Sequence, residues 1–96
     1  MINKFLDYIS VEKRYSQNTL VSYKKDLEDL LLFISETEGT EDLKKVDKKI
    51  IRNFIVSLSE KKIQKRSINR KLSSLRSFYL YLLKIGEIQK VNQAIL

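Results

Sequence analysis

The side chains most able to bind a ligand are a run of positively charged residues in the second half of the chain. Residues 61–86 carry eight basic side chains and no acidic one, whereas the net charge of the whole chain is +7. Phosphates neutralised by Lys or Arg release condensed counterions, so a surface of this kind attracts polyanions. Nucleic acid is therefore the first partner to consider, although a solvated helix face without any ligand also explains such a charge run.

The side chains that usually act in enzymes are scarce. The chain has no histidine and no cysteine, which excludes disulfides, zinc sites of the Cys/His kind and the common nucleophile–base pairs. A glycine-rich phosphate loop is also missing. Eight of the twelve acidic residues fall within residues 26–47, a poor setting for a paired catalytic carboxylate. We therefore expect no catalytic residue, no metal site and no cofactor.

The elements that position the basic side chains are predicted to be helices. Proline is absent and only two glycines occur, so few residues favour the tight turns that β-hairpins need. A hydrophobic content of 43% in 96 residues fits one folded domain. No apolar run is long enough to span a bilayer, and the N-terminus lacks a signal-peptide pattern. We expect a cytoplasmic protein without membrane contact.

Apolar residues at helical spacing predict three helices in the first two thirds of the chain. The first covers about residues 2–13. The second runs from a cap at Ser16 or Asn18 to a break near Gly39. A loop follows, and the third helix starts after an N-cap at Asp47 and fades near residues 61–65.

A fourth helix is predicted over about residues 67–85, before Gly86, and a short apolar tail of residues 91–96 follows it. On the face opposite its apolar stripe we expect Arg66, Arg70, Ser73 and Ser77. Short connections between four helices predict the all-α class, a four-helix bundle with a short C-terminal tail.

The start of the second helix is polar or basic, like the outer face of the fourth helix. If the two lie side by side, they form one basic surface with the acidic loop on the far side. Arg pairs bidentately with guanine edges or phosphates, and Asn pairs with adenine. The short side chain of Ser lets the helix backbone approach DNA closely. A solvated serine-rich surface is the alternative, but nearby acids for pairing within the fourth helix are missing.

Two segments carry recognisable spacing patterns. Residues 15–34, YSQNTLVSYKKDLEDLLLFI, match Ser-x-x-Thr-x-x-x-Tyr-x-x-Asp-Leu at Ser16, Thr19, Tyr23, Asp26 and Leu27. Residues 67–82, SINRKLSSLRSFYLYL, match Ser-x-x-Arg-x-Leu-Ser-x-Leu-Arg-x-Phe-Tyr at Ser67, Arg70, Leu72, Ser73, Leu75, Arg76, Phe78 and Tyr79. With these motifs, nearly the whole chain resembles the N-terminal SAM-like core-binding domain of tyrosine recombinases and phage integrases (Xer-like). The family usually ends this domain with Asn-Pro-Ala, and Gln93 stands here in place of that proline.

This resemblance implies a SAM-like four-helix bundle that clamps duplex DNA opposite a catalytic domain of the same protein. Residues 1–96 then form the core-binding domain, and the catalytic arginines, histidine and nucleophilic tyrosine lie outside this chain. The whole enzyme is expected to perform DNA recombination or integration through a 3′-phosphotyrosyl intermediate, without metal or nucleotide. Its partners are double-stranded DNA, the catalytic domain and other recombinase protomers on the DNA.

Carried over by matching position, the resemblance assigns DNA contact to residues of both motifs. From the first motif they are Ser16, Asn18, Thr19, Lys24 and Lys25. From the second motif and its approach they are Lys65, Arg66, Ser67, Asn69, Arg70, Ser74 and Arg76. The family positions of Phe78 and Tyr79 resemble core, and none of the five tyrosines is expected to be a nucleophile.

Two other functions remain open from the sequence. One is a stand-alone small helical DNA-binding regulator, which is expected to dimerise on a palindrome. The other is a helical protein-interaction module whose basic face meets an acidic partner. Salt-dependent duplex binding separates DNA from an acidic protein, and the oligomeric state separates a recombinase from a regulator.

Overall fold

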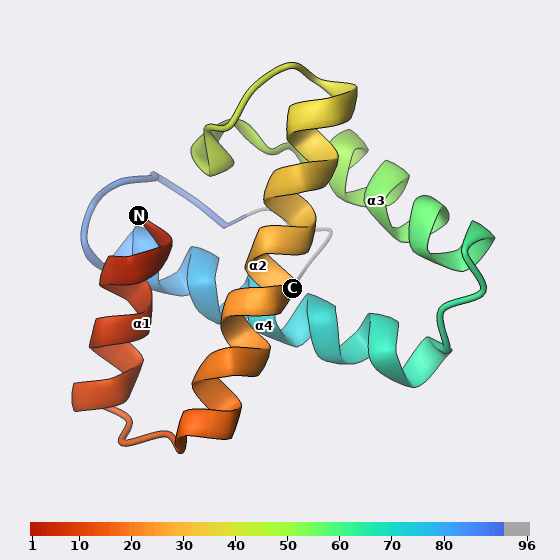
Figure 1. Ribbon diagram of the computed structural model, residues 1–96. Coiled ribbons are helices and arrows are strands. Elements are labelled where there is room, and N and C mark those ends of the chain that lie inside the picture. Colours follow the sequence, from red (N-terminus) through yellow and green to blue (C-terminus); the bar gives the residue numbers. More distant parts are fainter. Residues whose placement is uncertain (92–96) are drawn as a thin grey trace.

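The computed structural model describes residues 1–91, and this part of the chain is built from helices without any strand (Figure 1). The elements are α1 (Ile2–Val11), α2 (Gln17–Thr37), the 3-10 turn η1 (Leu43–Lys45), α3 (Lys48–Glu60) and α4 (Lys65–Lys84). The predicted all-α class with four helices is therefore confirmed. None of the helices within residues 1–91 is both long and apolar enough to cross a membrane.

Helix α2 occupies the centre of the bundle and contacts each of the other three α-helices. In Figure 1, α2 passes across α4, and α1 lies beside the first half of α2. After α3 the chain reverses direction in a short turn and enters α4. The start of α2 and the middle of α4 therefore come together, although the rest of α2, η1 and α3 lie between them in the sequence.

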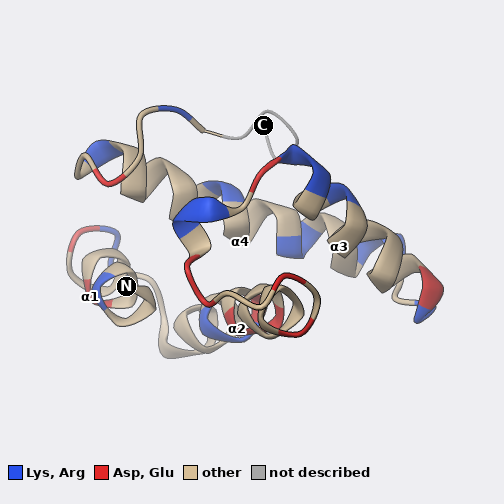
Figure 2. Ribbon diagram, turned by 90° about the horizontal axis from the view of Figure 1, so that it is seen from above, with Lys and Arg blue, Asp and Glu red and all other residues tan. Residues whose placement is uncertain are grey.

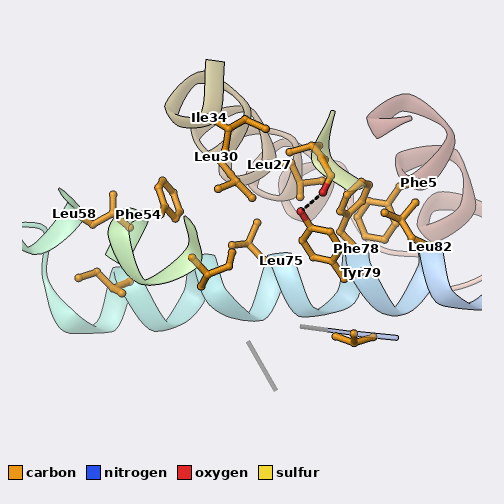
Figure 3. Packing of buried hydrophobic residues seen from close by; sticks show 14 of the residues in the cluster. Phe5, Leu27, Leu30, Ile34, Phe54, Leu58, Leu75, Phe78, Tyr79 and Leu82 are labelled. Atoms are coloured by element: carbon orange, nitrogen blue, oxygen red, sulfur yellow. Dashed lines mark hydrogen bonds between the residues drawn. The ribbon is translucent and has the colours of Figure 1, made fainter. Parts of the chain in front are cut away.

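The core lies between α2 and α4 and is closed at its two ends by α1 and α3 (Figure 3). Apolar side chains that leave water contribute most of the stabilisation of such a bundle. The largest fully buried apolar side chains are Phe5, Leu27, Leu30, Ile34, Ile51, Leu75, Phe78 and Leu82. The buried hydroxyl of Tyr79 donates to the Leu43 carbonyl at 2.7 Å and ties η1 to α4.

Local side-chain chemistry accounts for the helix starts. The Ser16 hydroxyl accepts from the Thr19 N–H at 3.3 Å, and the Asp47 carboxylate accepts from the Ile50 N–H at 2.9 Å. Both residues are thus N-caps: Asp47 as predicted, and Ser16 as one of the two candidates, Ser16 and Asn18, for the second helix. Beyond the ends of α2 and α4, Gly39 and Gly86 adopt positive φ angles of 67° and 80°, which glycine reaches without a steric penalty.

Two predicted helix boundaries differ from the structure. Helix α1 ends at Val11, two residues early, and α4 begins at Lys65, two residues before the predicted start. The early start follows from a compact α3–α4 turn, in which Lys62 adopts φ 61° and the Ile63 N–H donates to the Leu58 carbonyl. The predicted loop before α3 contains η1, and residues 92–96 of the predicted tail lie outside the described residues.

Candidate nucleic-acid interface

The first turns of α2 and the middle of α4 line a common cleft of about 310 Å³. Its walls are Asn18, Thr19, Ser22, Tyr23, Asp26, Arg70, Ser73 and Ser74. A hydrogen bond of 3.4 Å between the hydroxyls of Tyr23 and Ser77 joins the same two helices. The polar start of α2 thus lies beside the polar face of α4. The single surface predicted from the sequence requires this arrangement of the two helices.

A fully buried carboxylate, that of Asp26, forms the floor of this cleft. Its Oδ1 accepts from Arg70 Nη2 at 3.0 Å and from Lys71 Nζ at 3.3 Å, while its Oδ2 accepts from the Ser74 hydroxyl at 2.7 Å. Lys71 also donates to Asp29 at 2.6 Å. An ionised group out of water needs such partners, because its lost hydration must be replaced.

These contacts show what the sequence analysis missed. The cations of α4 have no acidic neighbours on their own helix, and they find them on α2, more than forty residues away in the chain. The amphipathic pattern of α2 carried a signal for this, because Asp26 precedes the core residue Leu27 and lies within reach of its apolar arc. Asp26 belongs to the first motif and to the acidic residues of 26–47, and no pairing with the cations of α4 was predicted for it.

The structure separates the predicted contact residues by exposure. On α2 and α4, the exposed ones are Ser16, Asn18, Lys24, Lys25, Lys65, Arg66, Asn69 and Arg70. Thr19, Ser67 and Arg76 are half-buried. Ser74 is only 5% exposed and its hydroxyl is bound to Asp26, so we leave it out of the interface proposed below.

Charge is distributed unevenly over the fold (Figure 2). Lys and Arg are spread along α3 and α4, whereas Asp and Glu gather at the end of α2 and in the loop that follows. Since a 21-residue helix is about 30 Å long, this acidic end is remote from the cleft at the start of α2. Within residues 1–91, no cluster of three or more acidic side chains is placed to hold a metal ion.

Comparison with known families identifies the fold and the motifs. The model of the phage integrase N-terminal SAM-like domain matches residues 2–86 of this chain. The chain belongs to this family. The match covers all four α-helices and both motifs that line the cleft, so the resemblance inferred from the sequence is confirmed.

Curated relatives carry the same name in several bacteria. The chain is 41% identical over 83 residues to the tyrosine recombinase XerC of Anoxybacillus flavithermus, a stretch that covers 86% of this chain and 27% of the relative. It is 35% identical to the XerC of Lacticaseibacillus casei, over 93% of this chain and 30% of the relative. It is 38% identical to that of Oceanobacillus iheyensis, over 92% of this chain and 28% of the relative.

The chain therefore spans less than a third of the length of these relatives, and the matched region is the N-terminal SAM-like domain. No solved structure matches the chain significantly.

Proposed function

We propose that this chain is the DNA-binding core-binding domain of a site-specific tyrosine recombinase. Residues 1–96 would cover one face of duplex DNA while the catalytic domain of the same protein covers the other. One observation carries the proposal: the cleft brings the two family motifs, from α2 and α4, together in a single polar surface, and the exposed cations Lys24, Lys25, Lys65 and Arg66 lie on the same two helices. Relatives named tyrosine recombinase support the wider assignment to DNA recombination or integration.

The exposed side chains divide into two kinds of DNA contact. Lys24, Lys25, Lys65 and Arg66 are long cations suited to phosphates, which fix the position of the protein without reading sequence. The N-cap residue of α4, Gln64, makes no side-chain capping bond, so the first N–H groups of the helix and its dipole favour an anion beside Lys65 and Arg66. Asn69 lies on the same exposed face and suits an adenine edge in the major groove.

The charge distribution orients the domain on DNA. The acidic end of α2 would be repelled by phosphates, whereas the start of α2 and the exposed face of α4 would be attracted. We place the catalytic domain and neighbouring recombinase protomers among the partners, and we propose a cytoplasmic location because the substrate is DNA. No cofactor enters this proposal.

The test is a titration of the isotope-labelled chain with a short duplex at low and at high salt. We expect NMR shifts confined to residues 16–25 and 65–77 that fade as salt rises. Arg66→Gln should flatten the slope of log K against log salt by about 0.9, the value of one phosphate contact. The matched control is Lys90→Gln, since Lys90 lines a different pocket with Lys44 and Tyr79.

Two outcomes would contradict the proposal. Equal changes in slope for Arg66→Gln and Lys90→Gln would show that net charge alone governs binding. An absence of shifts at low salt would leave the bundle intact and direct the search to an acidic protein partner for the basic surface.

A further inference from the structure

Arg70 occupies an unusual position for a side chain in a DNA interface. Its side chain is 53% exposed at the cleft, yet its Nη2 is bound at 3.0 Å to the fully buried carboxylate of Asp26. A carboxylate directly beneath a cation weakens its attraction for phosphate, so simple phosphate binding does not account for this arrangement. The pair needs a different explanation.

The four charges joined by ion pairs at this point of the cleft sum to zero. Asp26 and Asp29 contribute two negative charges, and Arg70 and Lys71 contribute two positive ones. The buried ammonium group of Lys71 bridges both carboxylates and can balance only one of them. Arg70 balances the other, so its charge is already compensated within the protein before any ligand arrives.

The carboxylate that holds Arg70 is itself fixed in place. Asp26 lies on α2, and its second oxygen accepts from the Ser74 hydroxyl at 2.7 Å on α4. Lys71 holds the first oxygen together with Arg70. Because Lys71 and Ser74 hold the carboxylate without any help from Arg70, the guanidinium group bound to it has a defined direction. A planar guanidinium has five N–H donors in a rigid fork, and those turned away from Asp26 remain for a ligand.

We propose that Asp26 is a positioning residue that orients Arg70 and cancels its charge, so that Arg70 meets DNA as a directed hydrogen-bond donor and not as a phosphate-neutralising cation. The ligand group that fits is a neutral acceptor pair on a base edge, such as O6 and N7 of guanine. Orientation before binding also reduces the conformational entropy lost in the complex. This inference rests on the DNA-binding function proposed above.

The first test compares two arginines on the same helix by salt dependence. In the chain bound to a short duplex pool of mixed sequence, Arg70→Gln should weaken binding roughly tenfold while leaving the slope of log K against log salt unchanged. Arg66→Gln should flatten that slope by about 0.9. A similar flattening for Arg70→Gln would overturn the proposal, because it would make Arg70 an ordinary phosphate contact.

The second test removes the compensating charge. Asp26→Asn should free the charge of Arg70 and steepen the slope by about 0.9, as one added phosphate contact. Glu28→Gln is the matched control, since it makes the same change in net charge on α2, and Glu28 is exposed and takes no part in the pairs with Arg70 and Lys71. Equal steepening in the two variants would overturn the positioning role.

A third measurement needs no variant and so does not depend on folding of Asp26→Asn. In the DNA-free labelled chain, rotation of the Arg70 guanidinium about Nε–Cζ should be slower than that of Arg66, which lies at the exposed start of α4. Equal rotation rates would overturn the proposal while leaving DNA binding intact. If the unaltered chain shows no salt-dependent duplex binding, both the proposed function and this inference fail together.

Discussion

At the scale of single residues, Asp47 shows how a local contact sets a helix boundary. Its carboxylate accepts the Ile50 N–H at 2.9 Å and satisfies a donor that the first turn of α3 leaves without an intrahelical partner. Asp47→Ala should lower the free energy of unfolding by about 1 kcal/mol, as measured by urea denaturation. Asp47→Asn keeps a capping oxygen and should retain most of the stability. Equal losses in the two variants would show that the cap does not stabilise α3.

Tyr79 provides a pH-dependent test of the packing between α4 and η1. Burial, with a smaller contribution from the negative charge of Asp42, raises the pKa of Tyr79 well above its ordinary value of 10.0. Because the folded-state pKa is raised, the stability from neutral Tyr79 is fully present below pH 10.0 and is lost as pH rises toward the folded-state pKa. Tyr79→Phe should cost about 1 kcal/mol at neutral pH through the lost bond to the Leu43 carbonyl.

The free-energy difference between wild type and Tyr79→Phe should then shrink in the alkaline range, because only the wild type has a hydroxyl at this position that ionises on unfolding. Tyr15→Phe is the control, since Tyr15 is exposed. Denaturation curves at several pH values would measure both differences. A constant difference for Tyr79→Phe across the alkaline range would contradict the account.

At the scale of elements, α4 supports the core with one face and the cleft with another. Leu75 is fully buried in the core (Figure 3). Leu80 of the same helix is 45% exposed. Leu75→Ala should destabilise the bundle by about 2–5 kcal/mol, because it leaves a cavity among packed helices. Leu80→Ala should change stability by less than about 0.5 kcal/mol. Thermal unfolding followed by circular dichroism would detect the contrast, and similar losses would show that α4 packs differently.

The polar face of α4 is also divided. A helical wheel assigns Arg66, Arg70, Ser73 and Ser77 to one outward strip. In the structure α2 crosses this strip, so Ser77 bonds to Tyr23 and Arg70 bonds to Asp26. Arg66 and Ser73 remain exposed. Spacing along one helix cannot show where a neighbouring helix crosses it, so the wheel overstated the solvated surface of α4.

At the scale of the whole molecule, helix packing turns scattered charges into a polarised body. The cationic start of α2 and the exposed face of α4 meet at the cleft, while the acidic end of α2 lies remote from it. A net charge of +7 attracts any polyanion to the protein as a whole. The uneven distribution of charge makes one face of the molecule the favoured side for a polyanion. Polarity of this kind suits the proposed role on one side of a duplex.

The residue patterns of the chain were sufficient to predict the all-α class, the four helices, the cap at Asp47 and the family, and they narrowed the cap of the second helix to Ser16 or Asn18. Each of these depends on interactions between residues close in sequence, or on motifs with fixed spacing. Helix periodicity needs only neighbouring turns, and a cap needs a side chain within three residues of the N–H that it binds. The boundary shifts at α1 and α4 arose in short turns where several local hydrogen bonds compete.

Only the tertiary structure decided what the cations of α4 face. The same run of Lys and Arg contains Lys71, which is buried against two carboxylates, and Arg66, which is exposed. Helical spacing places Lys71 beside the apolar stripe of α4 and Arg66 opposite it, but this spacing does not show which acidic groups Lys71 meets. The difference comes from α2, whose Asp26 precedes Arg70 by 44 residues and reaches it because the apolar faces of the two helices pack together. Burial of those faces sets the crossing point, and the crossing point determines which charges are paired and which remain for a ligand.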